Sequence, residues 1–254
     1  MSEDETRMAG HSKWANIKHR KARQDAAKGK AWSKCSKAII VAAKNGGGDP
    51  QTNLTLRYAI DEAKAANMPR DTIEKAVKKG SGELDTGETY EEIRYEGYGP
   101  GGVGVIVDCL TDKTTRTSPE LRKLFEKSGG NLGQTGAVSF GFERKGQVLI
   151  ESGRVTEEQL MEVALEAGAD DIQESDGGFE VLCDPSAFMA VKEAIEAAGI
   201  EMVESSITML PMNTIACDVE TAEKVLRLVD ALEEHDDVQN VYHNAEIPDE
   251  AVAG

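Results

Sequence analysis

Aromatic side chains and long hydrophobic runs are scarce in this chain of 254 residues. Phe, Trp and Tyr make up 5% of the sequence, and the longest strictly apolar run is the segment 38–43. A transmembrane helix needs about 20 consecutive apolar residues, and the acidic N-terminus lacks the apolar region of a secretory signal. These absences favour a soluble, cytoplasmic protein with no membrane partner and with several small cores.

Motifs for disulfide pairing, metal binding and catalysis are also missing. The four cysteines, at positions 35, 109, 183 and 217, form no C-x-x-C pair, so we expect free thiols in a reducing compartment. The acids and histidines at 235–243 lack the spacing of a metal site, and neither Ser118 nor Ser205 has a nearby triad histidine. The sequence therefore predicts a protein that is not an enzyme, with no metal and no cofactor.

A glycine-rich segment at 97–102, GYGPGG, matches the G-x-G-x-x-G pattern of dinucleotide-binding loops. Such a loop needs a helix start after it, so that the pyrophosphate lies on helical N–H groups. Here an apolar β-branched run follows, and Pro100 removes one N–H. We expect a loop that connects two strands, with contact to a partner as the alternative. The candidate contact residues, with a nearby arginine, are Gly97, Tyr98, Gly99, Gly101, Gly102 and Arg116.

Positive charge is concentrated near the N-terminus, although the whole chain has a net charge of −17. Residues 1–80 hold 17 basic and 9 acidic side chains, whereas residues 81–254 hold 12 basic and 37 acidic ones. Between residues 8 and 45 there are ten Lys or Arg residues and one acid, Asp25. A dense cationic cluster on an otherwise anionic protein favours a polyanionic partner. Nucleic acid is therefore the predicted partner, in contact with the N-terminal part.

The candidate nucleic-acid contacts all lie in this basic segment. They are Lys13, Trp14, Lys18, His19, Arg20, Lys21, Arg23, Lys28, Lys30, Lys34 and Lys37. An indole among cations can stack on an unpaired base. The alternative for Trp14 is that it packs the N-terminal segment onto the helices.

A helix is expected over residues 18–44, with apolar and basic residues on opposite faces. The apolar stripe is Trp32, Cys35, Ile39 and Ala42, and the lysine row is Lys30, Lys34, Lys37 and Lys44. The lysine row would then point outward, to solvent or to a polyanion. Two further helices are expected, one after Asn53 and one after Pro69, where a proline suits the first turn.

From residue 89 onward the pattern changes to short strands and helices. Strands are expected at 90–95, 103–110 and 137–142, a helix is expected to start at 117–119, and residues 214–244 add strand, helix and strand. Residues 146–210 show the order βαββαβ, which is a ferredoxin-like unit. The sequence thus predicts an α+β fold: an N-terminal helical domain plus two ferredoxin-like α/β domains, the third inserted in the second.

The expected domain organisation follows from these elements. It comprises a flexible leader at 1–7, a basic helical domain at 8–80, a discontinuous α/β domain at 81–142 and 211–250, and an inserted domain at 143–210.

Several longer motifs are specific enough to identify a family. They are MAGHSKWANIKHRK at 8–21, GGGDP at 46–50, NMPR at 67–70, YEGYGPGG at 95–102, LTD at 110–112, RT at 116–117, GGNLG at 129–133 and DVQNVYHN at 237–244. Through them the chain resembles the YebC family, also called PmpR or TACO-type proteins, over residues 8–250. Residues 1–7 precede that family's usual start.

The resemblance implies three domains around a cavity, in a cytoplasmic bacterial protein that acts on gene expression without an enzymatic step. Two activities are attached to the family. One is binding of promoter DNA by a transcriptional regulator. The other is association with the ribosome or mRNA by a translation factor that helps elongation through difficult stretches such as consecutive prolines. The mitochondrial relatives are translational activators.

Three functions remain as hypotheses for this chain, which we expect to be a monomer or weak dimer. We favour a factor that binds rRNA or mRNA on the ribosome, because cations, a stacking aromatic and glycine-rich loops suit RNA. A DNA-binding transcriptional regulator is the alternative, although no clear helix-turn-helix with a base-reading face is present. A protein-interaction module that uses its acidic domains is the third.

Overall fold

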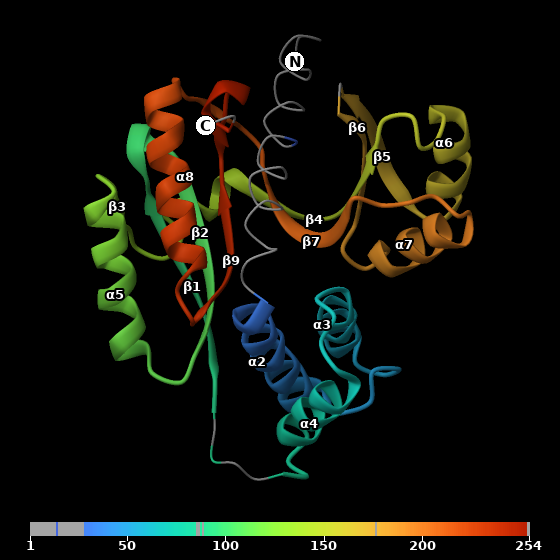
Figure 1. Ribbon diagram of the computed structural model, residues 1–254, viewed down its shortest axis with the longest axis horizontal. Helices are drawn as coiled ribbons and strands as arrows, with labels where there is room; N and C mark the ends of the chain where they lie inside the picture. Colours follow the sequence, from blue (N-terminus) through green and yellow to red (C-terminus); the bar gives the residue numbers. More distant parts are fainter. Residues whose placement is uncertain (1–13, 15–27, 85–86, 88, 176, 253–254) are drawn as a thin grey trace.

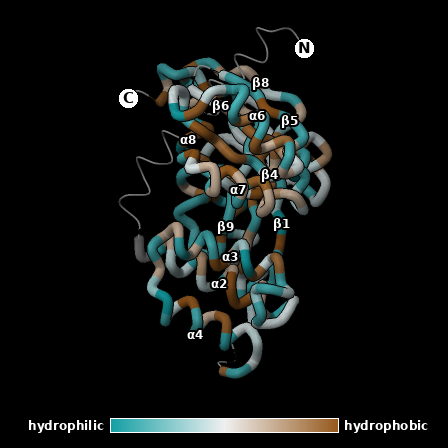
Figure 2. Tube along the Cα trace, turned by 90° about the vertical axis from the view of Figure 1, so that its right-hand side faces the viewer, coloured by the Kyte–Doolittle hydropathy of each residue, from teal (hydrophilic) through white to brown (hydrophobic). Residues whose placement is uncertain are grey.

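The structure is a computed structural model. It describes residue 14 and residues 28–84, 87, 89–175 and 177–252. The fold is α+β, with a helical part followed by two antiparallel four-stranded sheets and their helices (Figure 1). Figure 2 shows the helical part on one side of the sheet-containing part. Within the described residues, no helix is both long enough and apolar enough to cross a membrane.

The helical part consists of α2 (Lys28–Gly46), α3 (Leu54–Ala65) and α4 (Arg70–Gly80). Their apolar faces share a core that includes Ile39, Ala43, Leu56, Ala63, Met68, Ile73 and Ala76. Asn53 caps α3, because its Oδ1 accepts the N–H of Leu56 at 3.1 Å. Its Nδ2 also donates to the carbonyl of Ala42 at 2.8 Å. One side chain therefore starts α3 and ties it to α2.

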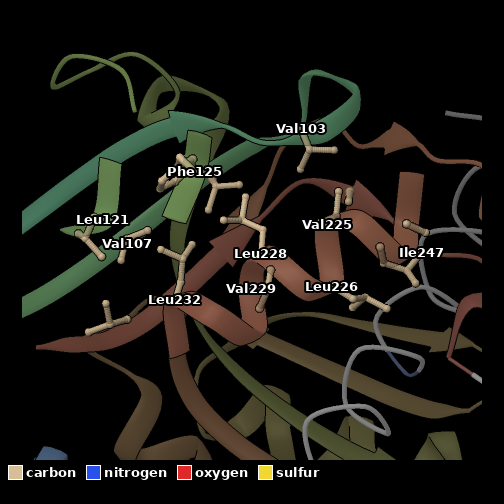
Figure 3. Close-up of a cluster of buried hydrophobic side chains, with 14 of the residues drawn as sticks. Val103, Val107, Leu121, Phe125, Val225, Leu226, Leu228, Val229, Leu232 and Ile247 are labelled. Carbon is tan, nitrogen blue, oxygen red and sulfur yellow. The ribbon is translucent and has the colours of Figure 1, made fainter. Parts of the chain in front are cut away.

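The first sheet has the strand order β3-β1-β2-β9, and all its pairings are antiparallel. Its strands are β1 (Glu91–Tyr98), β2 (Gly104–Thr111), β3 (Asn131–Leu132) and β9 (Val238–His243). Helices α5 (Thr114–Lys127) and α8 (Val219–Glu233) cover one face. Figure 3 shows Val107 of β2 and Leu228 and Leu232 of α8 pointing into the core between sheet and helix.

The second sheet has the order β5-β6-β4-β7. In chain order its elements are β4 (Phe142–Glu151), α6 (Glu157–Glu166), β5 (Ala169–Ser175), β6 (Gly178–Cys183), α7 (Phe188–Ala197) and β7 (Glu204–Pro211). This succession confirms the predicted βαββαβ unit. Thr156 caps α6 through a reciprocal bond with Gln159, as the pattern of a capping box requires.

The second sheet lies, in sequence, between β3 and the C-terminal elements. After β7 the chain forms β8 (Ile215–Ala216), α8, β9 and β10 (Ala245–Glu246), with β8 parallel to β10. Three short 3-10 helices, η1 (Pro100–Gly102), η2 (Ser139–Gly141) and η3 (Asp249–Ala251), occupy connections. A small core of Ile106, Val138, Phe142 and Met209 packs between the two sheets.

Two sequence predictions differ from the structure. The strand expected at 137–142 is a loop up to η2, because the buried carboxylate of Glu96 accepts the N–H groups of Gly136, Val138 and Ser139 at 2.8–2.9 Å. The helix expected to start at 117–119 begins earlier, at Thr114, so Pro119 lies inside α5.

Candidate nucleic-acid interface

Several predicted contacts lie outside the described residues. They are Lys13, Lys18, His19, Arg20, Lys21 and Arg23, together with the side chain of Lys28, whose main chain begins α2. Their role in binding stays a prediction.

Three lysines on one face of α2 contact the C-terminal end of α8. The distances are 2.7 Å from Lys30 Nζ to Glu234 O, 2.7 Å from Lys34 Nζ to Glu233 O and 3.0 Å from Lys37 Nζ to Asp236 O. The last carbonyls of a helix have no partner within the helix and form the negative end of its dipole. Lys34 and Lys30 therefore satisfy carbonyls at the end of α8, Lys37 bonds a carbonyl in the turn that follows, and together they hold α2 against this end of α8.

The expectation that this whole lysine row points outward was wrong for Lys34 and Lys37, while Lys30 stays exposed although it bonds Glu234. Lys37 is largely buried, with 13% of its side chain exposed, whereas Lys30 keeps 46%. Burial lowers the pKa of Lys34, while the nearby Glu233 opposes this effect. Helical periodicity identifies the side chains that share a face. It does not identify what packs on that face, and here the partner is about 200 residues away in sequence.

Asp237 extends this contact into a buried charge cluster. Its Oδ1 accepts from Lys37 Nζ at 2.9 Å, and its Oδ2 accepts from Arg116 Nη2 at 2.7 Å and from Thr117 Oγ1 at 2.8 Å. Burial alone would raise the pKa of the Asp237 carboxyl, but the bonds from Arg116, Lys37 and Thr117 hold it well below its usual range. Arg116 also donates to Asp112 at 2.9 Å. The predicted contact at Arg116 is thus engaged within the protein.

The glycine-rich segment connects β1 to β2, as predicted. Gly97 and Tyr98 end β1, and Tyr98 pairs with Gly104 across the hairpin. Gly101 and Gly102 have φ angles of +70° and +77°, a region that favours glycine. A Cβ on Gly97 would lie 2.6 Å from the carbonyl oxygen of Asn131, so strand β3 needs a glycine there.

Two further residues of this loop also have structural roles. Gly99 donates its N–H to the carbonyl of Val103 at 2.7 Å, which closes the turn. Tyr98, with 38% exposure, donates its hydroxyl to the carbonyl of Ala137 at 2.8 Å. Folding alone accounts for these residues, and contact of the loop with a partner stays a prediction.

Trp14 is the one residue of the N-terminal basic segment before α2 that the structure describes. Its indole Nε1 donates to Ser175 Oγ at 2.9 Å, at the end of β5. A Cβ on Gly177 would lie 2.4 Å from the indole ring. Trp14 therefore packs on the β5–β6 hairpin, whereas the packing alternative from the sequence placed it on the helices.

Sequence reasoning missed an exposed apolar pair. Phe140 and Met212 are 76% and 57% exposed, and the N–H of Met212 donates to the carbonyl of Gly141 at 2.9 Å. The pair lies where the chain passes from the first sheet into the second and back. Ala137, Val138 and Phe142 surround Phe140 in sequence, so composition alone did not distinguish it from a core residue.

The histidines near the C-terminus already have hydrogen-bond partners. His235 Nδ1 accepts the N–H of Asp237 at 3.1 Å, so its Nε2 is the donor toward Glu120 at 2.9 Å. His243 Nδ1 accepts the N–H of Ala245 at 3.2 Å, and burial lowers the pKa of His243 to about 4. In the part of the chain that the structure describes, no three His, Cys, Asp or Glu side chains could together hold a metal ion.

Comparison with known proteins finds relatives that are named as regulators. A "probable transcriptional regulatory protein" of Caldanaerobacter subterraneus subsp. tengcongensis is 52% identical over 244 residues, covering 96% of this chain and 100% of that protein. One of Pseudomonas syringae pv. syringae is 54% identical over 246 residues, covering 96% and 98%. The crystal structure of a conserved hypothetical protein from Aquifex aeolicus matches with a TM-score of 0.78 and 48% identity, covering 89% of this chain and 93% of that one.

Two family models together match most of the sequence. Residues 12–83 match the TACO1/YebC protein N-terminal domain. Residues 90–245 match the TACO1/YebC second and third domain. The chain therefore belongs to the TACO1/YebC family.

Proposed function

We propose that this protein is a non-enzymatic regulator of gene expression that binds nucleic acid through its N-terminal basic segment, residues 13–28. The observation that supports this most strongly is the local reversal of charge in a chain of net charge −17. Internal contacts engage Lys30, Lys34 and Lys37. The proposed phosphate contacts are therefore the remaining cations Lys13, Lys18, Arg20, Lys21, Arg23 and Lys28.

We infer that the target is RNA, on the ribosome or in mRNA, and that the protein acts in translation, including elongation through difficult stretches such as consecutive prolines. A helix that reads duplex DNA commonly presents Asn, Gln or Arg to base edges. Helix α4, which follows a short turn after α3, contains neither Asn nor Gln, and Glu74 engages its Arg70 at 2.8 Å. Sequence-specific recognition of RNA relies instead on stacking and main-chain approach, which suits Trp14 and the glycine-rich loops.

The second candidate is a DNA-binding transcriptional regulator. The observation that favours it is the name of the relatives, which are called probable transcriptional regulatory proteins. This candidate uses the same basic segment, because both targets present phosphates.

The experiment compares two nucleic acids at matched salt. Sedimentation with ribosomes and a shift assay with labelled duplex DNA are performed on the wild-type protein and on a variant with Lys18, Arg20, Lys21 and Arg23 changed to Glu. A matched control changes four exposed lysines elsewhere, Lys75, Lys78, Lys123 and Lys127, to Glu.

We expect the wild type and the control to sediment with ribosomes and the charge-reversed variant to remain in the supernatant. A tight, sequence-selective footprint on duplex DNA without ribosome binding would favour the transcriptional alternative. If the variant changed at Lys18, Arg20, Lys21 and Arg23 binds as well as the control, the proposed contact is contradicted altogether.

A further inference from the structure

Trp14 packs on the β5–β6 hairpin against Ser175 and Gly177, which we call the Trp14 site. A Cβ on Gly177 would lie 2.4–2.5 Å from three ring atoms of Trp14, so any side chain at this position collides with the ring. The φ of Gly177 is not in the left-handed region, whereas its neighbour Gly178 has a φ of +141°. The indole therefore occupies the space that a side chain at 177 would need.

Ser175 supplies the hydrogen-bond acceptor of the Trp14 site. Its Oγ donates to the carbonyl of Gly178 at 3.3 Å, which leaves the oxygen's lone pairs facing the indole N–H. The main-chain pairing of Ser175 with Gly178 places this hydroxyl at the end of β5, beside the carbonyl that it bonds.

Charge also favours the N-terminal segment as the occupant of this surface. The Trp14 site belongs to the second sheet. Residues 143–210, which include this sheet, contain 16 acidic and 4 basic side chains. The residues on either side of Trp14 in sequence are basic, with Lys13, Lys18, Arg20, Lys21 and Arg23 within ten positions. A cationic segment anchored on a strongly anionic unit gains a favourable electrostatic interaction.

We propose that the β5–β6 hairpin is an intramolecular docking surface for the N-terminal basic segment, with Trp14 as its anchor, and that docking competes with nucleic-acid binding. The competition rests on the proposed function, whereas the docking does not. When the indole leaves Ser175 and Gly177, the same segment and its aromatic ring become available to a nucleic acid. The measured association constant is then the intrinsic association constant multiplied by the fraction of molecules in which Trp14 is undocked.

The docking is tested first, without nucleic acid. The sequence contains two tryptophans, so changing Trp32 to Phe leaves Trp14 as the sole tryptophan, whose emission can be excited apart from that of the tyrosines. In that background Gly177→Ala should shift the Trp14 emission to longer wavelength and increase its quenching by acrylamide, and Ser175→Ala should do the same more weakly. The matched control is Gly141→Ala, because a Cβ at Gly141 meets nothing within 4 Å. Unchanged emission in Gly177→Ala would overturn the proposal.

The competition is tested next, with labelled poly(U) as the probe. If about one molecule in ten is undocked, release of the anchor should tighten binding by up to about tenfold, and the Gly141→Ala control should bind like its parent. Shifted emission with unchanged or weaker binding would overturn the competition and make the hairpin a support for binding. If no variant and no parent binds the probe while the emission still shifts, the proposed function and the competition both fail and the docking surface is supported.

Discussion

At Asp237, side chains from separate segments meet on one carboxylate. Lys37 arrives from α2, and Arg116 and Thr117 arrive from α5. Asp237 is 2% exposed, so water cannot replace a lost partner. Removing the carboxylate is costly because it leaves the buried ammonium group of Lys37 without its counter-charge, whereas Arg116 keeps Asp112 and contact with solvent.

Asp237→Asn tests this cluster, because it keeps the shape of the side chain and removes its charge. We expect a loss of about 3–5 kcal/mol in the free energy of unfolding, measured by urea denaturation. Asp236→Asn is the matched control, since that side chain is 80% exposed, and it should cost less than about 0.5 kcal/mol. Similar small losses in both variants would contradict the importance of the cluster.

The same residue predicts a dependence on pH. The pKa of folded Asp237 is lowered, so its contribution to stability is complete above the unfolded pKa of about 3.9. That contribution is lost as the pH falls through the folded pKa. The stability difference between wild type and Asp237→Asn should therefore be constant from pH 7 to about 5 and begin to shrink below about pH 4. Urea denaturation at several pH values measures it, and a constant difference down to pH 2 would contradict the assignment.

Glu96 organises the loop that precedes η2. Burial of its carboxylate favours the neutral form, but the N–H groups of Val138, Gly136 and Ser139 lower its pKa overall. Glu96→Gln replaces one acceptor oxygen by a donor, and hydrogen bonds to a charged group are worth about 1.5–3 kcal/mol. We expect faster amide hydrogen exchange at 136–139 than in the wild type. Unchanged exchange there would show that the loop does not depend on this carboxylate.

At the scale of elements, the sequence predicted most helices and strands of the sheet-containing part. The order βαββαβ could be read because Thr156 starts a helix, glycines follow the helix ends and apolar residues are concentrated in the strands. The contact between α2 and α8 could not be read. The lysine row and its carbonyl partners are each ordinary surface features until the chain brings them together. The same holds for Glu96, whose partners are main-chain N–H groups without a sequence signature.

Lys34→Met tests the contact between α2 and α8, because it keeps an unbranched stem and removes the ammonium group. The amine of Lys34 lies at the negative end of α8 and donates to Glu233 O at 2.7 Å. We expect a loss of about 1–2 kcal/mol in the free energy of unfolding. Lys44→Met, at an exposed lysine of the same helix, should have little effect. An equal loss of stability in both variants would show that the contact of Lys34 with α8 does not stabilise the fold.

At the scale of the whole molecule, the N-terminal segment differs in charge from the rest of the chain. The sequence identified this asymmetry, and the structure shows which of the described cations are engaged within the protein. Lys30, Lys34, Lys37 and Arg116 join parts of the protein to each other. The cations at 13–28 are the group that we assign to phosphates. Helical periodicity could not separate Lys30, Lys34 and Lys37 from the cations at 13–28, because all of these follow one another in one basic stretch of sequence.

The dependence of nucleic-acid affinity on salt tests the central claim most directly. Each phosphate neutralised by a cation contributes about 0.7 to the slope of log affinity against log salt for a single strand, and about 0.9 for a duplex. We predict a steep slope for the wild type, retained when Lys75, Lys78, Lys123 and Lys127 are changed to Glu. The slope should be nearly flat, with weak residual binding, when Lys18, Arg20, Lys21 and Arg23 are changed. An equally steep slope for that last variant would contradict the claim that the N-terminal basic segment binds the phosphates.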